Sequence, residues 1–568
     1  MKSQNGFFLI LLVLLLAALM RIGNAGHNST WSDEGWNRWV VTDTPVETIF
    51  SRLAANHHPP AYFMGLALWK NIAGDNRLSL RFLAIAVGML SVALLYRIGA
   101  DQFGHRAGLF SALLFAVFEQ SVYYGQAVRH YGWLVLGVCL MLLLFLRTLK
   151  NPRNALLIAY ALSIAFAMYT MYLAVFIWAV QVIAGIVFWR RSPRDKLRLF
   201  RAWVGVGLLL LPWFIYALPE QWHKVQAGII KGYPNSFETT PASLLMMSDL
   251  LLGGQFVIGA ALIGLALWKI ARQRLLTQIV IAVCGVGLFL LLSVLNLFVG
   301  LLSERTLFFL LPSILLLLGY GFQQLQPRLQ GLLAGAMLVW MLFTPQGIIP
   351  RINSDGVARA IALAYNPGDF VLLETGFDDV AFEYELLLTL PPENRQVFRS
   401  YYEYDYPDDA AMMNRLNSLL ETQQRVWLVY WNVPARMANH LLSLGFTAIQ
   451  QTEIPIGEND PLYPTYPTIE ITLFARPDLT GETHSFGDLF ELKDRLVTET
   501  IPRGDNLQVD LWWSPLKQVD RDYSVGVFLL DDQGVTRLQH IGPDATQPTT
   551  TWNINQLYFD RHTLPIPA

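Results

Sequence analysis

The chain has 568 residues, of which 54% are hydrophobic and only 15% are charged, and its formal net charge is -2. Because soluble proteins carry charge on about a quarter of their residues, this composition excludes a single soluble fold and a disordered chain. The charge is also divided along the chain: residues 1–345 hold 26 Lys and Arg against 12 Asp and Glu, whereas residues 346–568 hold 15 against 31. No basic face dominates the whole protein, which excludes a nucleic-acid binder that depends on such a face. The divided charge indicates two parts of the chain with different surroundings.

Apolar stretches long enough to cross a bilayer recur through the first 345 residues. A transmembrane helix needs about 17 to 25 predominantly apolar residues. We therefore predict that residues 1–347 form one polytopic α-helical membrane domain with about eleven spans. The predicted spans are 6–22, 78–97, 106–123, 131–148, 154–170, 172–189, 202–218, 255–270, 276–297, 306–322 and 331–347.

The basic residues of the short loops predict how this domain is oriented. Lys and Arg near the ends of spans stay on the cytoplasmic side. With a cytoplasmic N-terminus, the basic run between residues 190 and 201 is cytoplasmic, and most acidic residues of the membrane domain lie on the other side. The odd number of spans places the C-terminal part outside as well. We expect a multi-pass protein of the cell (inner or plasma) membrane whose chemistry and C-terminal domains are extracytoplasmic.

The C-terminal part is predicted to form two further domains, 348–480 and 481–568. In the first, strand-like runs such as 370–374 alternate with helical runs such as 411–421, which is typical of a small α/β domain. In the second, short strands dominate, and the turn residues 531–534 predict a hairpin within a small β-sandwich. Neither domain contains a phosphate-binding glycine loop or a hydrolase motif, so we expect no catalytic site in them.

Two adjacent carboxylates, Asp33 and Glu34, lie between two tryptophans just after the first span. Carboxylates at a low-dielectric boundary are costly unless they are paired or used. One of them could be a general base that accepts a proton from an attacking hydroxyl group. Burial beside the indole rings would raise its pKa toward the working pH. A solvated loop with an ion pair to Arg38 or Arg52 explains the same pattern.

The same predicted loop ends with His57 and His58, which precede a proline pair that stiffens the start of the next helix. The histidines could bind a phosphate, cap the helix, or complete a metal site with Asp33 and Glu34. Histidine and carboxylate are suitable ligand types for a divalent cation such as Mg, Mn or Zn, although their spacing matches no fixed motif. The metal is therefore one open alternative.

Two arginines near the ends of spans are candidates for binding a phosphate. Arg129 lies between Gln126 and Tyr131 at the start of the fourth span, and Arg305 lies at the start of the tenth. An arginine so close to hydrocarbon usually has a fixed partner, so pairing with a nearby carboxylate or snorkelling explains both positions. Alternatively, each guanidinium group could bind a phosphate through its paired donors.

Taken together, these side chains suit a lipid-phosphate substrate on the outer side of the membrane. The isoprenoid tail would lie among the spans, and arginine donors would stabilise the charge that develops on the phosphate as a sugar leaves. A carboxylate would activate the acceptor hydroxyl group.

At these residues the chain resembles the bacterial membrane glycosyltransferases of the C-type fold, family 39 and its relatives. This group includes protein O-mannosyltransferases and lipid A aminoarabinose transferases. The resemblance is specific over residues 31–131 and mainly topological in the rest of the membrane domain. The matching residues are Trp31-Ser32-Asp33-Glu34, His58-Pro59-Pro60-x-Tyr62, Arg81, Phe103-Gly104-x-Arg106-Ala107-Gly108, Gln126, Arg129, Tyr131, and Arg305 with Pro312.

The resemblance implies an inverting transfer of a hexose or pentose from a polyprenyl-phosphate donor to an acceptor hydroxyl group on a glycan, lipid or protein. By position, Asp33 has the role of the base, and Glu34 supports it or helps to hold a metal. The resemblance assigns Arg129 and Arg305 to the phosphate. One departure is Ala127, which stands where the family usually has a glutamate. The residues assigned to the shape of the donor pocket are His57, His58, Gln126 and Tyr131.

Two other classes of protein fit parts of the pattern. A polytopic secondary transporter, or a flippase of a lipid-linked sugar, also has many spans, but transporters place polar groups near the middle of the bilayer. Here the spans are nearly free of charge at that depth. A membrane-anchored binding protein would need a single anchor, which leaves some eleven spans unexplained.

Overall fold

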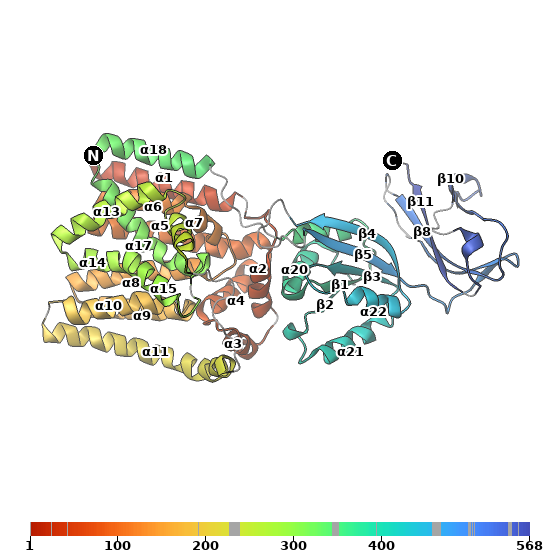
Figure 1. The fold of residues 1–568 in the computed structure, drawn as a ribbon, viewed down its shortest axis with the longest axis horizontal. Helices are drawn as coiled ribbons and strands as arrows, with labels where there is room; N and C mark the ends of the chain where they lie inside the picture. The colour runs from red at the N-terminus through yellow and green to blue at the C-terminus, as the bar shows by residue number, and fades with distance from the viewer. Residues whose placement is uncertain are drawn as a thin grey trace. The chain divides into compact units, whose positions relative to one another are not determined.

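The structure is a computed structural model in which the chain forms two compact units (Figure 1). The first unit comprises Met1–Asn28 and Trp36–Ile349, and the second comprises Ser29–Gly35 and Pro350–Ala568. The structure describes every residue except 1, 24, 43, 191, 227–238, 301, 344–351, 394, 457–466, 498–500, 502–503, 505, 543–547, 555 and 568.

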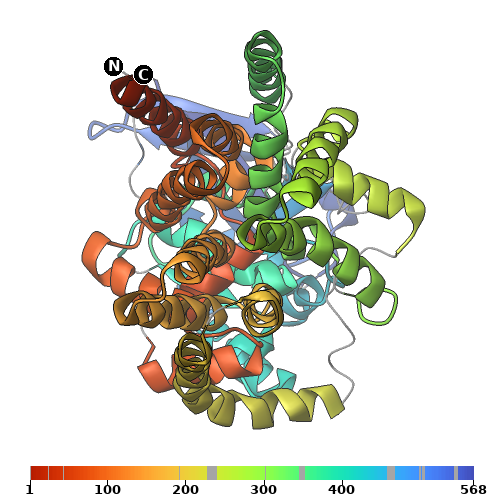
Figure 2. The same cartoon turned by 90° about the vertical axis from the view of Figure 1, so that its left-hand side faces the viewer.

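The first unit is helical, and its long helices run side by side (Figure 2). The helix α2 (Ser32–Val41) begins in the second unit and ends in the first. The other helices of the first unit are α1 (Lys2–Ile22), α3 (Val46–Ala55), α4 (Ala61–Ala73), α5 (Arg77–Gln102), α6 (His105–Val117), α7 (Glu119–Tyr124), α8 (Tyr131–Lys150), α9 (Asn154–Thr170), α10 (Ala174–Ile183), α11 (Pro193–Gln226), α12 (Pro241–Leu251), α13 (Phe256–Gln273), α14 (Leu276–Ala282), α15 (Leu288–Leu295), α16 (Glu304–Leu307), α17 (Leu311–Gln323) and α18 (Pro327–Phe343).

Within the described residues, six helical segments are long and apolar enough to cross a membrane, and several shorter apolar helices accompany them. The protein is therefore a multi-pass membrane protein, as predicted, while the number of eleven spans stays a prediction. The segment Glu304–Gln323 is almost wholly buried inside the unit. Its helix α17 packs closely on α6, so that a Cβ atom added at Gly319 would overlap the carbonyl oxygen of Ala107.

The prediction of one continuous helix over residues 106–123 is wrong. The segment is divided into α6 and α7 at Phe118, whose backbone is extended with φ of -67° and ψ of 127°. A broken helix leaves carbonyl groups without partners. The buried guanidinium group of Arg21 donates to two of them, the carbonyls of Ala116 at 2.9 Å and Phe115 at 3.0 Å.

The second unit contains the predicted α/β fold, a five-stranded sheet in the order β2-β1-β3-β5-β4 with helices on both faces. The strand β1 pairs in parallel with β2 and β3, and β5 is antiparallel to β3 and β4. The strands are β1 (Phe370–Glu374), β2 (Gln396–Arg399), β3 (Arg425–Tyr430), β4 (Thr447–Pro455) and β5 (Thr468–Ala475), and the helices are α19 (Ser354–Ala362), α20 (Asp379–Thr389), α21 (Asp409–Leu420) and α22 (Met437–Ser443).

All five residues of β1 are buried, because helices cover both of its faces. Val371 and Leu373 pack in the hydrophobic core that includes residues of α19 and α20. Phe370 and Leu372 pack in the core that includes residues of α21 and α22. This alternation fixes the sheet between two helical layers.

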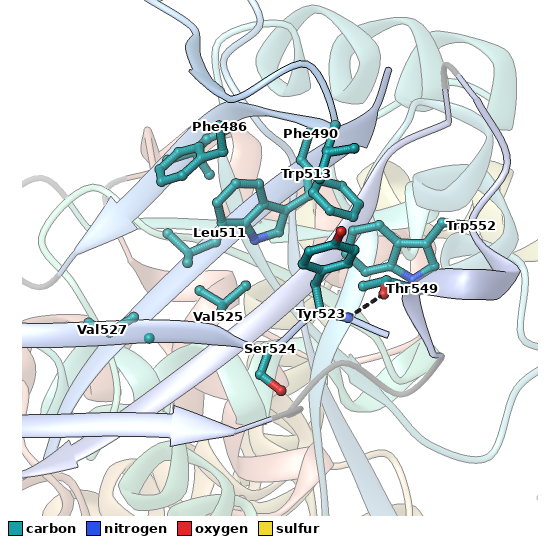
Figure 3. A pocket seen from close by; sticks show the side chains of 13 residues that line it. Phe486, Phe490, Leu511, Trp513, Tyr523, Ser524, Val525, Val527, Thr549 and Trp552 are labelled. Atoms are coloured by element: carbon teal, nitrogen blue, oxygen red, sulfur yellow. Dashed lines mark hydrogen bonds between the residues drawn. The ribbon is translucent and has the colours of Figure 1, made fainter. Parts of the chain in front are cut away.

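The last part of the chain forms two antiparallel sheets, one of four strands in the order β11-β8-β7-β6 and one of two strands. The two-stranded sheet is the predicted hairpin, which turns at Gly534 with a φ of 75°. A pocket of about 360 Å³ lies between the sheets and is lined by Trp513, Tyr523 and Trp552 among others (Figure 3). The strands are β6 (His484–Phe486), β7 (Phe490–Val497), β8 (Asn506–Pro515), β9 (Val525–Leu530), β10 (Thr536–Gly542) and β11 (Tyr558–Pro565).

Candidate active site

The segment after α1, predicted to be a loop, folds into the three helices α2, α3 and α4. Asp33 and Glu34 lie in the first turn of α2, where the helix dipole stabilises negative charge. Pro60 directly precedes α4, in agreement with the predicted stiff start of that helix. Of the two arginines named as alternative partners for the carboxylates, Arg38 forms an ion pair of 2.7 Å with Asp75. The other, Arg52, stacks on an indole ring of α2.

In the first unit, Arg129 is held by an asparagine that the sequence analysis did not identify. Arg129 is 5% exposed, and its Nη1 atom donates to Oδ1 of Asn37 at 3.2 Å. Asn37 is fully buried, and its Nδ2 atom donates to the carbonyl of Val128 at 2.6 Å. It therefore fixes both the main chain and the side chain of this segment. Its position four residues after Asp33, on the same face of α2, is the sequence signal that could have revealed it.

The histidines predicted to lie near a phosphate belong to an aromatic cluster. The ring of His58 lies 5.1 Å from that of Trp36 and 5.2 Å from that of His130, measured between centres. Burial, followed by the charges of Arg129 and His57, lowers the pKa of His58 to about 3. Burial also lowers the pKa of His130 well below its ordinary value. Both rings are consequently neutral at physiological pH and can each donate one N–H group.

His130 was missed because it fills a variable position of the matching motif, yet it lies among the predicted phosphate-binding residues. The charges of Arg129 and Arg305 both lower its pKa, so both guanidinium groups lie near enough to act on this ring. Its Nδ1 atom has no hydrogen-bond partner within the described residues. Its ring centre lies 4.4 Å from that of Tyr131. The first unit thus brings together Arg129, Arg305, His58 and Tyr131 around His130.

The remaining two predicted residues have other surroundings. Gln126 donates from Nε2 to the carbonyl of Met20 at 3.0 Å and so ties the end of α1 to the segment before α8. His57 follows α3 and has a φ of 62°, a left-handed conformation that reverses the chain before His58. Both positions shape the backbone around the cluster. Their predicted contact with a donor stays a prediction.

Asp33 and Glu34 lie in the segment Ser29–Gly35, which belongs to the second unit. Glu34 is 2% exposed, whereas Asp33 is partly exposed and is the more accessible carboxylate. Ser32 lies near enough to Asp378, a buried residue of the α/β fold, to act on its carboxyl group. Burial, helped by the charges of Asp379 and Asp33, raises the pKa of Asp378 to about 7. No sequence motif indicated a role for Asp378.

The divalent cation stays a prediction, which the side chains that the structure describes do not decide. Among those residues, no group of three or more His, Cys, Asp or Glu side chains could hold a metal ion. The predicted ligands Asp33 and Glu34 belong to the second unit, and His57 and His58 belong to the first.

The comparison with protein families gives one match. The model of the dolichyl-phosphate-mannose-protein mannosyltransferases matches residues 57–218, a range that contains His58, Arg129 and His130. A search of curated protein sequences finds no match.

Two solved structures of ArnT from Cupriavidus metallidurans are similar to this chain over most of its length. The apo form has a TM-score of 0.54 at 12% identity and covers 83% of this chain and 98% of its own. The form bound to undecaprenyl phosphate has a TM-score of 0.53 at 14% identity, with coverage of 82% and 97%. The chain has the C-type glycosyltransferase fold. The predicted resemblance and fold class are confirmed, and the range of the family match contains His58, Arg129, His130 and Tyr131, while Arg305 lies beyond it.

Proposed function

We propose that the protein is an inverting glycosyltransferase that moves a hexose or pentose from a polyprenyl phosphate to an acceptor hydroxyl group. The family match over residues 57–218 carries this proposal, because that range contains His58, Arg129 and His130, which are suited to a lipid phosphate. The similar fold of an ArnT structure that binds undecaprenyl phosphate supports it. The reaction takes place on the outer face of the cell membrane, with the N-terminus in the cytoplasm.

In the proposed reaction, Asp33 accepts the proton of the acceptor hydroxyl group. The oxygen attacks the anomeric carbon from the side opposite the phosphate, and the bond between that carbon and the phosphate oxygen breaks. The configuration is inverted, and polyprenyl phosphate leaves. Arg129 and Arg305 stabilise the negative charge that grows on the phosphate. The neutral rings of His58 and His130 each have one N–H group to donate without adding charge.

The proposal is tested with Asp33→Asn in membranes that contain the full-length protein. A general base contributes about 10²- to 10⁴-fold to a rate, so we expect kcat to fall by that factor at unchanged expression. The assay measures transfer of labelled sugar from a panel of polyprenyl-phosphate hexoses and pentoses. Asp409→Asn is a matched control, because Asp409 is an exposed acid of the second unit that pairs with Arg436.

Two results would contradict the proposal. Full activity of Asp33→Asn would exclude Asp33 as the base. If the wild-type protein transfers no sugar but moves a lipid-linked sugar across the bilayer of proteoliposomes, the alternative of a flippase is correct.

A further inference from the structure

The short segment Ser29–Gly35, which carries both candidate catalytic carboxylates, is held from both ends by side chains and backbone of the α/β fold. These contacts all lie inside the second unit. The first residue of the segment is held by α19, because the hydroxyl group of Ser29 donates to a carboxylate oxygen of Asp355. The contacts that follow determine where Asp33 lies.

The peptide groups on both sides of Thr30 are fixed by two buried side chains. The N–H of Thr30 donates to Oε1 of Glu385 on α20 at 2.9 Å. The hydroxyl group of Ser354 on α19 donates to the carbonyl of Thr30 at 2.8 Å. Glu385 and Ser354 are both fully buried. Hydrogen bonds of a backbone group at both its donor and its acceptor leave it little freedom to move.

The other end of the segment is fixed by packing. The backbone of Gly35 lies so close to α20 that a Cβ atom there would be 2.7 Å from the nitrogen of Ala381. The segment from Ser29 to Gly35 is therefore attached to α19 and to α20. The backbone that carries Asp33 is thus held on both sides.

We propose that Glu385 and Ser354 are positioning residues of the glycosyltransferase, which hold the backbone that carries the Asp33 base. This inference rests on the proposed function. It gives the C-terminal α/β fold a part in the reaction. A base must lie within hydrogen-bond reach of the proton it accepts, and a displacement of about 1 Å can lower a rate on the order of 10²-fold.

The first test uses Glu385→Ala and Glu385→Gln in the full-length protein. Alanine removes the acceptor of the Thr30 N–H, whereas glutamine keeps a side-chain oxygen at the same place. We expect kcat to fall about 10- to 100-fold in Glu385→Ala with KM for the donor unchanged, and to recover in Glu385→Gln. Ser354→Ala should behave like Glu385→Ala. Its control is Ser418→Ala, which removes an exposed serine hydroxyl group that also donates to a backbone carbonyl.

The second test is hydrogen–deuterium exchange of the peptide that covers residues 29–35, which needs no activity. The amide of Thr30 should exchange at least 10-fold faster in Glu385→Ala than in the wild type. An unchanged exchange rate overturns the inference, and so does faster exchange at an unchanged kcat. If the wild type itself transfers no sugar, the proposed function fails, and the exchange rate still decides whether Glu385 holds the segment.

Discussion

Gly35→Ala is a substitution for which two physical effects predict opposite results. Gly35 lies in the first half of α2, where intrinsic propensity favours alanine over glycine by about 1 kcal/mol. A Cβ atom there would, however, lie 2.7 Å from the nitrogen of Ala381, 2.8 Å from its Cα atom and 2.9 Å from the carbonyl carbon of Val380. All three are backbone atoms of α20 and cannot rotate away.

The size of the effect follows from these distances. Non-bonded atoms pack best at roughly 3.5 to 4.0 Å, so α2 must move from α20 by nearly 1 Å. Overpacking of this kind costs about 1 to 3 kcal/mol, which exceeds the gain in helix propensity. A displacement of about 1 Å at the Asp33 backbone should also lower kcat on the order of 10²-fold.

The assays are thermal unfolding of the purified protein in detergent and transfer of labelled sugar in membranes. Gly205→Ala is the matched control, because a Cβ atom at Gly205 in α11 meets nothing within 4 Å. We expect a lower Tm and a lower kcat for Gly35→Ala and neither for Gly205→Ala. A Gly35→Ala protein with an unchanged or higher Tm and full kcat would refute the close approach of α2 to α20.

Two further predictions concern the phosphate and the pH. Arg129→Ala should raise KM for the polyprenyl-phosphate donor at least 10-fold and leave KM for the acceptor unchanged. The control is Arg272→Ala, at the exposed end of α13. Equal effects on both substrates would indicate a structural arginine. Burial raises the pKa of Asp378 and of Asp379 to about 7. The folded state therefore favours their protonated form, and their contribution to the free energy of unfolding is complete below the ordinary pKa of 3.8 and is lost as the pH rises through 7. The Tm of the wild type should fall between pH 5 and pH 8, and the Tm of Asp379→Asn should fall less. An equal fall in Tm for both proteins would contradict the raised pKa of the Asp379 carboxyl group.

The parts of the fold that could be predicted from the sequence are those with a local pattern. The strand over 370–374 agrees with β1 at both ends, and the hairpin turn at 531–534 is in place, because alternation and turn residues act over a few positions. The break at Phe118 could not be predicted, because the hydrogen bonds that stabilise it come from Arg21 on another helix.

The candidate site was predictable to a similar degree. The motif residues Arg129, His58 and Tyr131 do gather in one place, with Arg305 near enough to act electrostatically on the same histidine. The contacts of Thr30 could not be inferred, since its two partners lie 324 and 355 residues away along the chain. Neither periodicity nor motif spacing can predict a contact between residues so far apart in the sequence.

That separation also sets an order of events during synthesis. Ribosomes add about 5 to 20 residues per second, so the codon for Glu385 is reached roughly 20 to 70 s after the codon for Thr30. During most of this interval the Asp33 segment has left the ribosome, but Ser354 and Glu385, which hold it in the folded protein, have not yet been synthesised. The active centre is completed only when the part of the chain beyond the membrane helices has been made and folded, so a nascent or prematurely terminated chain has its spans but no positioned base.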